Sequence, residues 1–364
     1  MLDIRTNRKD KVPYGQKLAF GSGHLVLNLL PGALAVFMFF LVTAFGMDPF
    51  LAGLLGGLPR IFDALTDPIM GFISDNTKSK WGRRRPYILA GAVLSGVLFA
   101  LLFQMSEDNS VMFNFWYFLI MSLLFLVGNT MFATPLVGLG YEMTSDYNER
   151  TRLMAFANTV CQIAWMLVPW FLVVIAEPTV FPFNDETLRM IGEMGLQGDE
   201  LQKITDQKLQ GTGVRNLSIM VGLVCAVLGV LPAFFCKGID AGKMENRKQI
   251  SLKTLSSSFK ELFQGIKEVF KNKPFMKLCG ATFLVFNGFQ MVASFSFFII
   301  VFYIYNGDYG MAGTWPAWFA SFTALVTAFM VIPIISRIAN KWGKRSAFVI
   351  STVISIVGYI LKWW

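Results

Sequence analysis

Nine stretches of the chain run for about 18 or more residues with almost nothing but apolar side chains, a length sufficient for a helix to cross a bilayer. Hydrophobic residues make up 54% of the sequence and charged residues only 15%, so one soluble core could not bury all the apolar surface. We therefore predict an all-α polytopic membrane protein with nine transmembrane helices. Their predicted limits are Lys17–Phe45, Pro49–Ile73, Pro86–Met105, Val111–Val137, Leu153–Ala176, Leu217–Phe235, Phe275–Tyr305, Trp315–Ile338 and Ala347–Leu361.

Basic residues gather in alternate connections between these runs. Lys and Arg precede the first run and follow the second, fourth, sixth and eighth, whereas the opposite connections are short or acidic. Because basic loops stay in the cytoplasm, we predict a multi-pass protein of the cell (cytoplasmic or inner) membrane with a cytoplasmic N-terminus. The net charge of +9 then reflects membrane topology, so the lipid bilayer is the expected partner and nucleic acid is not.

A repeated motif divides the chain into two halves. The motif KWGRR (residues 80–84) follows the second run, and KWGKR (residues 341–345) follows the eighth run. The repeat predicts a six-plus-six helix plan, as in carriers built from parallel repeats. Since the sequence holds nine runs, we expect the last three helices to be missing from it.

Two connections carry extra sequence and set the expected domain limits. Residues 251–270 have apolar side chains at helical spacing, which predicts an amphipathic helix on the cytoplasmic surface. Residues 177–215 form an insert on the other side, with short helices predicted to begin after Asn184 or Asp185 and after Asp199; it is either a solvated cap or a lid over the external mouth. The expected regions are an N-terminal six-helix bundle at 1–236, a linker at 237–274 and an incomplete C-terminal bundle at 275–364.

The second apolar run contains three charged residues on one helical face. Arg60, Asp63 and Asp67 are spaced i, i+3 and i+7, and a charge facing lipid is disfavoured by about 3 kcal/mol, so this face must line a cavity. Two carboxylates one turn apart repel, unless one is protonated or a cation lies between them. Asp63 and Asp67 are therefore candidate ligands for Na⁺, with Arg60 as their charge partner. The alternative is an inert ion cluster that fastens this helix to a neighbour.

Polar side chains in other runs are candidates for a solute site. Amide groups can hydrogen-bond sugar hydroxyls and an aromatic face can stack on a sugar ring, but Asn and Gln also commonly bond between membrane helices. The single histidine, His24, is more typical of a structural residue. The candidate substrate-binding residues are Asn28, Asn129, Asn158, Gln162, Trp165, Asn287 and Gln290.

Charged residues at the predicted inner ends of the second to fifth runs suggest a cytoplasmic gate. Their pairing would be individually weak, about 0 to 1 kcal/mol, which suits groups that bias a nearly balanced equilibrium between two conformations. For the arginines, the alternative is a role as topology anchors. The candidate gate residues are Asp75, Arg83, Arg84, Arg85, Glu142 and Arg150.

Two long segments point to a family. RIFDALTDPIMGFISDNTKSKWGRRRPYI (Arg60–Ile88) and TPLVGLGYEMTSDYNERTRL (Thr134–Leu153) resemble the signature segments of the glycoside-pentoside-hexuronide:cation symporters, the melibiose permease-like branch of the major facilitator superfamily. The resemblance implies a carrier that moves a sugar by alternating access, driven by Na⁺ or H⁺ and acting as a monomer. It also implies that Asp63 and Asp67 bind the cation, with Thr130 contributing a hydroxyl.

The chain departs from that branch at its galactoside contacts. Where the branch has an acid and an arginine, this chain has Ala133 and Asn158, and Leu27 or Asn28 replaces a further acid. The substrate could therefore be a pentoside, a hexuronide or another glycoside. Lysolipid carriers resemble this fold and share its acids, so a cation-coupled carrier of an amphipathic solute is an alternative, and a non-transporting membrane sensor is another. No enzyme motif is present and no cofactor is expected beyond the coupling ion.

Overall fold

The computed structural model describes residues 11–77, 79–175, 177–182, 191, 198–238, 267–268, 270–298, 303 and 314–361. Within these ranges the regular structure is entirely helical. Six helices or helix pairs there are long and apolar enough to cross a membrane, against the nine predicted. The second predicted span, which carries Arg60, Asp63 and Asp67, is helical but is not among the six. The prediction of an all-α polytopic membrane protein is confirmed.

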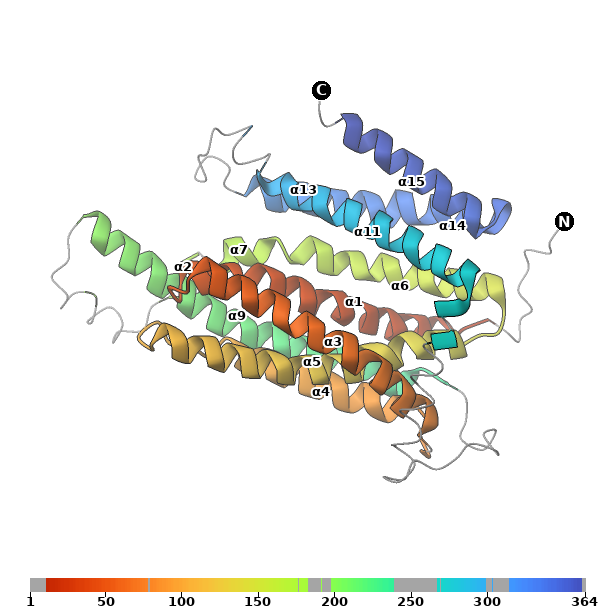
Figure 1. Ribbon diagram of the computed structural model, residues 1–364, viewed down its shortest axis with the longest axis horizontal. Coiled ribbons are helices and arrows are strands. Elements are labelled where there is room, and N and C mark those ends of the chain that lie inside the picture. The colour runs from red at the N-terminus through yellow and green to blue at the C-terminus, as the bar shows by residue number, and fades with distance from the viewer. Residues whose placement is uncertain are drawn as a thin grey trace.

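The helices of the first six predicted spans lie side by side along the long axis of the molecule (Figure 1). The first and fifth spans are each divided into two helices, and the fourth continues five residues past its predicted end, to Glu142. The bounds are α1 Tyr14–Phe37, α2 Phe39–Thr43, α3 Pro49–Asn76, α4 Arg85–Leu102, α5 Val111–Glu142, α6 Tyr147–Leu167, α7 Trp170–Ile175 and α9 Asp199–Phe235.

The later helices lie along one side of this bundle (Figure 1). They begin with α11, and the eighth predicted span consists of α13, a π-helical turn and α14. Most of the predicted amphipathic helix at 251–270 lies outside the described residues. The bounds are α11 Lys273–Phe298, α13 Trp315–Val326, the π-helical turn Thr327–Val331, α14 Ile332–Trp342 and α15 Lys344–Leu361.

Prolines account for two interruptions of these spans. Pro169 lies between α6 and α7, and the π-helical turn ends just before Pro333. Proline has no backbone N–H and its ring collides with the preceding turn, so the helical hydrogen-bond ladder must break or widen there.

The insert is built differently from the prediction. Its second short helix and the sixth span are one continuous helix, α9, and the N-cap is Gly198 at φ 65°, not Asp199. Gly211 and Gly213 lie inside this helix, at points where neighbouring groups approach it closely. A Cβ atom on Gly213 would lie 2.5 Å from the carbonyl oxygen of Ile175. The first predicted helix of the insert lies outside the described residues apart from Ile191.

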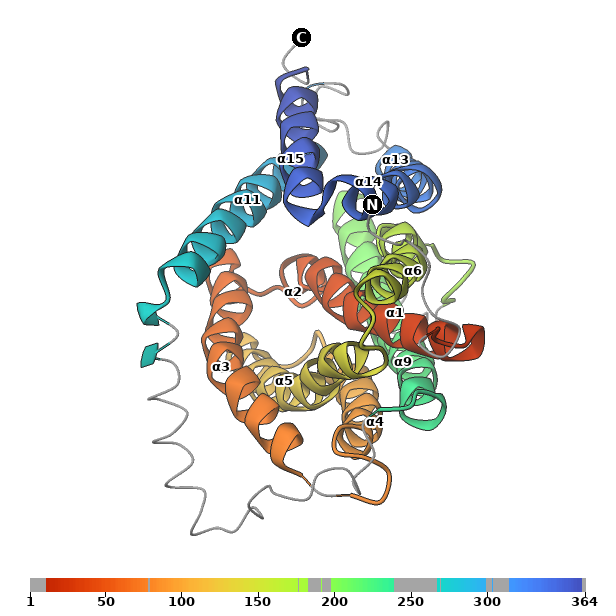
Figure 2. The ribbon, with the colours of Figure 1, turned by 90° about the vertical axis from the view of Figure 1, so that its right-hand side faces the viewer.

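Small residues let the N-terminal helices approach closely. α4 packs on α5 and α9, α1 packs on α6 and α9, and α3 packs on α5, as the view down the bundle shows (Figure 2). A Cβ atom on Gly96 would lie 2.5 Å from the carbonyl oxygen of Gly222, so only glycine permits this contact of α4 with α9. Such pairs of small residues are typical of helix packing in membranes.

The C-terminal helices contact the N-terminal bundle mainly through α6 and α7. At one end, the indole Nε1 of Trp170 donates to Ser321 Oγ at 2.8 Å, and the ring of Trp170 meets that of Trp318 edge to face at 5.0 Å. At the other end, Lys344 Nζ lies 3.9 Å from the ring centroid of Tyr147. We call this contact of α6 and α7 with α13, α14 and the start of α15 the α6–α14 seam.

The two copies of the repeated motif share a backbone conformation. Gly82 has a φ of 93° and Gly343 a φ of 88°, values in the left-handed region that glycine adopts without strain. Gly343 lies directly between α14, which ends at Trp342, and α15, which begins at Lys344, whereas Gly82 lies within the longer connection from Asn76 to Arg85. The two copies of the motif therefore share a glycine of positive φ in a connection between two helices.

Candidate functional site

Two carboxylates of α3 face two hydroxyl groups of α5. Thr130 Oγ1 donates to Asp63 Oδ1 at 3.1 Å, and Thr134 Oγ1 donates to Asp67 Oδ1 at 3.3 Å. Thr66, one turn from Asp63 on α3, lies 3.5 Å from Thr130 between the hydroxyl oxygens. We call Asp63, Asp67, Thr130 and Thr134 the carboxylate–hydroxyl site.

The geometry of this site follows from helix register. Each bonded pair is separated by 67 residues, and each helix contributes residues spaced i, i+4. Because both bonded pairs are separated by the same number of residues, α3 and α5 must run in the same direction. The step from Asp63 to Asp67 along α3 then matches the step from Thr130 to Thr134 along α5. Thr134 was not predicted as a site residue; its spacing of four from Thr130 is the signal that could have indicated it.

The structure does not form the predicted cluster of Arg60 with the two acids. Among the described residues, no ion pair joins the Arg60 guanidinium to Asp63 or Asp67, and Arg60 is exposed. The carboxylate oxygens instead accept hydrogen bonds from the hydroxyls of α5. The residues of one helical face were correctly assigned, but the partner of that face is a second helix.

The carboxylate–hydroxyl site has ligands suited to a hard cation. Carboxylate and hydroxyl oxygens are donors that such ions prefer, and carboxylates also accept protons. Within the described ranges, no three His, Cys, Asp or Glu residues are grouped so as to hold a metal ion. The donor set therefore fits a small monovalent ion, Na⁺ or H⁺, better than a transition metal.

The predicted substrate residues do not form one hydrogen-bonded group. Among those whose side chains are described, none bonds to another of the set. The amides of Asn28 and Asn287 donate to the carbonyls of His24 and Phe283, four residues earlier on their own helices. Asn129 is half-buried, and its Oδ1, which is itself buried, has no hydrogen-bond partner among the described residues.

The remaining candidates lie on two helices. Asn158 and Trp165 are exposed on α6, and Gln162 is half-buried on the same helix. Gln290 belongs to α11, but its side chain lies outside the described residues. His24, predicted to be structural, is half-buried with its ring 4.7 Å from that of Phe20.

Four of the six candidate gate residues form one ionic cluster at the basic end of the bundle, the predicted cytoplasmic end. Arg84 Nη2 lies 2.6 Å from Asp75 Oδ1, and Arg84 Nε lies 3.0 Å from Glu142 Oε1. Arg83 Nε donates to the same oxygen of Glu142 at 2.7 Å. Asp75, Arg83, Arg84 and Glu142, which we call the inner charge cluster, thus join the ends of α3 and α5 to the start of α4.

The other two candidate gate residues have backbone partners. Arg85 bonds the carbonyls of Ala233 and Phe234, so it ties α4 to the end of α9 and is not paired with Asp75 as predicted. The terminal carbonyls of a helix lack intrahelical partners, and the Arg85 guanidinium fills that need. Arg150 Nη2 donates to the carbonyl of Thr144 at 3.0 Å.

A buried acid at the same end was not predicted. Glu149 is only 2% exposed, and its Oε1 lies 2.6 Å from Lys17 Nζ and accepts the backbone N–H of Val12 at 3.2 Å. The signal in the sequence that could have indicated Glu149 was an acidic residue inside an otherwise basic loop. This contact fixes the segment before α1 to the first turn of α6.

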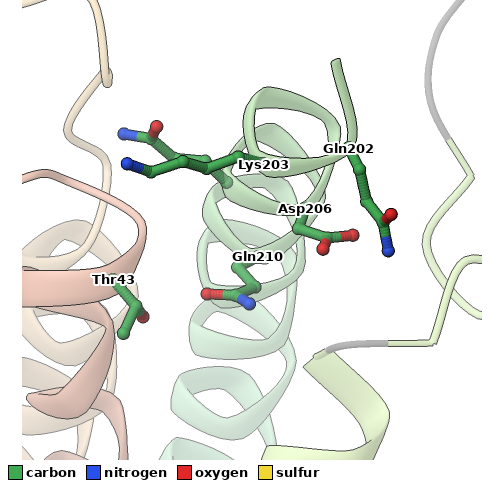
Figure 3. Close-up of a pocket in the computed structure, with 6 residues that line it drawn as sticks. Thr43, Gln202, Lys203, Asp206 and Gln210 are labelled. Atoms are coloured by element: carbon green, nitrogen blue, oxygen red, sulfur yellow. The ribbon is translucent and has the colours of Figure 1, made fainter. Parts of the chain in front are cut away.

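The opposite end of the bundle is closed by ion pairs and contains a polar pocket. Lys208 and Arg215 of α9 pair with Asp108 and Glu107 at 2.8 Å and 2.9 Å, which holds the insert against the connection between α4 and α5. Beside it, a cavity of about 390 Å³ lies between α9 and the end of α2. Figure 3 shows Gln210 directed toward Thr43, with Asp206 and Gln202 pointing the other way.

Comparison with known proteins identifies relatives along most of the chain. The family described as MFS/sugar transport protein matches residues 19–364. An uncharacterised symporter of Synechocystis sp. is 31% identical over 197 residues, which cover 51% of this chain and 35% of the relative. An isoprimeverose transporter of Lactiplantibacillus pentosus is 23% identical, with 98% of this chain and 65% of the relative covered.

A vertebrate protein is also similar over nearly the whole of this chain. Sodium-dependent lysophosphatidylcholine symporter 1 of Xenopus tropicalis is 22% identical, with 95% of this chain and 64% of the relative covered. The chain thus spans about one third to two thirds of the length of these curated relatives. Because the family match covers nearly the whole chain, this integral membrane protein belongs to the MFS/sugar transport family, and the predicted membership of the glycoside-pentoside-hexuronide:cation symporters is confirmed.

Proposed function

We propose that the protein is a symporter that couples the movement of a sugar to that of Na⁺ or H⁺ across the cell membrane, with its basic end in the cytoplasm. The observation that carries the proposal is the carboxylate–hydroxyl site, in which two acids inside a membrane span are held by hydroxyls and not by basic groups. An acid placed there is costly and is typical of an ion pathway. The names of the relatives, which are symporters, support the same activity.

The charge of the site gives a reason for coupling. Two ionised carboxylates carry −2, and one bound Na⁺ leaves −1, which a proton or an approach of Arg60 would balance. An alternating-access carrier passes through an occluded state from which water has left, and an uncompensated charge is strongly disfavoured there. Cation binding therefore lowers the cost of occlusion, and sugar and cation tighten each other's binding by the same factor.

The two carboxylates provide the main test. In the full-length protein in proteoliposomes, Asp63→Asn and Asp67→Asn should each abolish Na⁺-stimulated uptake of labelled sugars from a panel of glycosides, pentosides and hexuronides, while sugar counterflow without Na⁺ persists. Asp206→Asn, a change at an exposed acid of the insert, is the control and should behave like the wild type. Unchanged Na⁺ stimulation in both site variants would rule out the assignment.

Substitutions of Thr134 distinguish a role in ion binding from a role in helix packing alone. Thr134→Val keeps the shape but removes the hydroxyl, whereas Thr134→Ser keeps the hydroxyl. Because a hydrogen bond to a charged group contributes about 1.5 kcal/mol or more, Thr134→Val should weaken Na⁺ binding by about tenfold and Thr134→Ser should not. Calorimetric titration with Na⁺ at several pH values measures this, and Na⁺ affinity should also fall as protons compete at lower pH. Equal affinities in the two variants would contradict a role for the hydroxyl.

A lysolipid is the second candidate substrate, because a relative of similar coverage is named a sodium-dependent lysophosphatidylcholine symporter. Polar groups in the spans, including the unpartnered Asn129 Oδ1, favour a sugar. The two are separated by adding labelled lysophosphatidylcholine to the same counterflow panel. Saturable ligand binding without flux of any labelled solute would indicate a membrane sensor.

A further inference from the structure

A large cavity opens at the basic end of the bundle, apart from the carboxylate–hydroxyl site. Its volume is about 880 Å³, and it lies between the segment before α1, the connection that follows α5 and the segment after α9. Its lining includes five basic residues and one acid: Lys11, Arg83, Arg84, Arg150, Lys237 and Glu142. The proposed transport activity rests on the carboxylate–hydroxyl site and gives no role to this excess of positive charge.

The basic residues fall into two groups. Arg83 and Arg84 are paired with Asp75 and Glu142 in the inner charge cluster. In contrast, no ion pair to Lys11, Lys237 or Arg150 occurs among the described residues. Three positive charges from three separate segments therefore line one cavity and are not paired with a carboxylate among the described residues.

Arg150 is held in place by groups that leave part of its guanidinium free. Its Nη2 donates to the carbonyls of Thr144 and Tyr141, and its Cζ lies 5.7 Å from the centroid of the Tyr141 ring. Its buried Nε has no hydrogen-bond partner among the described residues. The guanidinium is therefore only partly satisfied by the groups around it, and an anion in the cavity would add a partner for its charge.

We propose that this cavity binds a phosphate-bearing anion, with Arg150 as the anchor and Lys11 and Lys237 at the rim. Arginine suits the planar, multiple hydrogen bonding of phosphate, and lysine adds mobile point charges. Basic pockets between helices at the cytoplasmic side of a membrane are typical sites for anionic lipid head groups, and a volume of about 880 Å³ exceeds the size of phosphate alone. The phosphate group could belong to a lipid head group or to a soluble ion.

The site would also communicate with the inner charge cluster. Arg83, Arg84 and Glu142 line the same cavity, so a bound anion would compete with Glu142 for the two guanidinium groups. This inference does not depend on the proposed transport activity, because its test measures binding alone.

The test uses the full chain purified in neutral detergent. Short-chain phosphatidylglycerol, short-chain phosphatidylcholine as its zwitterionic counterpart without net charge, and inorganic phosphate are titrated separately. The melting temperature and, by native mass spectrometry, the bound mass are recorded. The variants are Arg150→Gln and the double variant Lys11→Gln/Lys237→Gln, whose two lysines are exposed and so are dispensable for folding. Lys203→Gln, at an exposed lysine of the opposite end, is the matched control.

We expect phosphatidylglycerol to bind the wild type and the control, with affinity lowered about tenfold in the double variant and in Arg150→Gln. If inorganic phosphate also raises the melting temperature, the phosphate group alone accounts for the binding. If only phosphatidylglycerol raises it, the site recognises a lipid head group. Both results support the site. Binding of neither anion, equal binding of phosphatidylcholine, or undiminished binding in the double variant would overturn the proposal.

Discussion

Gly138 controls the position of a charged residue on the neighbouring helix. A Cβ atom at this position would lie 1.1 Å from Nη1 of Arg84, so the guanidinium occupies the space of the missing side chain. Glycine lets the Arg84 guanidinium, the end of a long side chain, approach this closely, and the backbone conformation is ordinary helix. The smallest side chain would therefore expel Arg84 from the inner charge cluster.

At the scale of single residues, a prediction concerns Gly138→Ala. We expect it to break the contact of Arg84 with Asp75 and so to shift a reporter cysteine toward the accessibility of the inward-open state, as Asp75→Ala should also do. Labelling rates of that cysteine measure the shift. Gly53→Ala on α3, where nothing lies within 4 Å of the added carbon, is the control. Labelling rates that stay at the wild-type level in Gly138→Ala and Asp75→Ala would leave the arginines as topology anchors.

Which residues share one face of a helix was easier to predict from the sequence than which groups a second helix brings to them. Asp63, Asp67 and Thr130 were assigned from one face of a helix and a family resemblance, and the structure brings them together. Arg60 was paired wrongly, because spacing along one helix does not reveal that a second helix supplies the hydrogen-bond donors. The amides of Asn28 and Asn287 likewise bond their own helices, a local contact that residue type alone does not distinguish from ligand binding.

At the scale of elements, α9 depends on ion pairs at its outer end. The hydrogen bond from Lys208 holds the pKa of the Asp108 carboxyl below its ordinary value of 3.8. A lowered pKa in the folded state means that the contact stabilises the fold above the ordinary pKa and is lost as pH falls through the folded-state pKa. The connection between α4 and α5 should therefore loosen from the insert in acid.

We expect Lys208→Met to lower the melting temperature near pH 7, by an amount equivalent to no more than about 1 kcal/mol because the Asp108 carboxylate is largely exposed. The difference from the wild type should shrink in acid, because the Asp108 carboxyl takes up its proton as pH falls through its lowered folded-state pKa. Thermal unfolding in detergent near neutral pH and in acid measures this. A difference that is the same at both pH values would mean that Lys208 stabilises α9 by packing.

Element limits were predictable where apolar runs end at charged or capping residues. The predicted starts at Pro49, Val111 and Trp315 coincide with the observed starts of α3, α5 and α13. The continuity of α9 was not predicted, because the insert was expected to contain a short helix after Asp199 that is separate from the span beginning at Leu217. The role of Gly211 and Gly213 is visible only when the groups that press against them are known, which are Glu107 for Gly211 and α7 for Gly213.

At the scale of the whole molecule, the α6–α14 seam joins the two halves. Its outer end holds a hydrogen bond and a ring contact at Trp170. Trp170→Phe keeps an aromatic ring but removes the donor, so it should destabilise the protein by about 1 kcal/mol. Ser321→Ala removes the acceptor of the same bond, and the two changes together should cost clearly less than their sum. Denaturant unfolding in detergent measures the cycle; strictly additive effects would contradict a shared bond.

The division of the chain into two halves was predicted from the repeated motif. The matching positive φ values of Gly82 and Gly343 give that repeat a structural basis. A turn that needs glycine at one position leaves a visible mark in sequence. The α6–α14 seam has no such signal in the sequence, because the partners of its side chains, such as Ser321 for Trp170 and Tyr147 for Lys344, depend on the three-dimensional arrangement.

The buried carboxylate of Glu149 has a consequence for how the chain is made. It bonds Val12, 137 residues earlier, and α1 packs mainly on α6 and α9 and not on α3, its neighbour in sequence. While the ribosome is still synthesising the intervening helices, Lys17 has no buried acid to meet and α1 has only lipid along its main contact face. The first helix to enter the membrane thus lacks its partner α6 until translation has passed Leu167, and it lacks α9 until translation has passed Phe235.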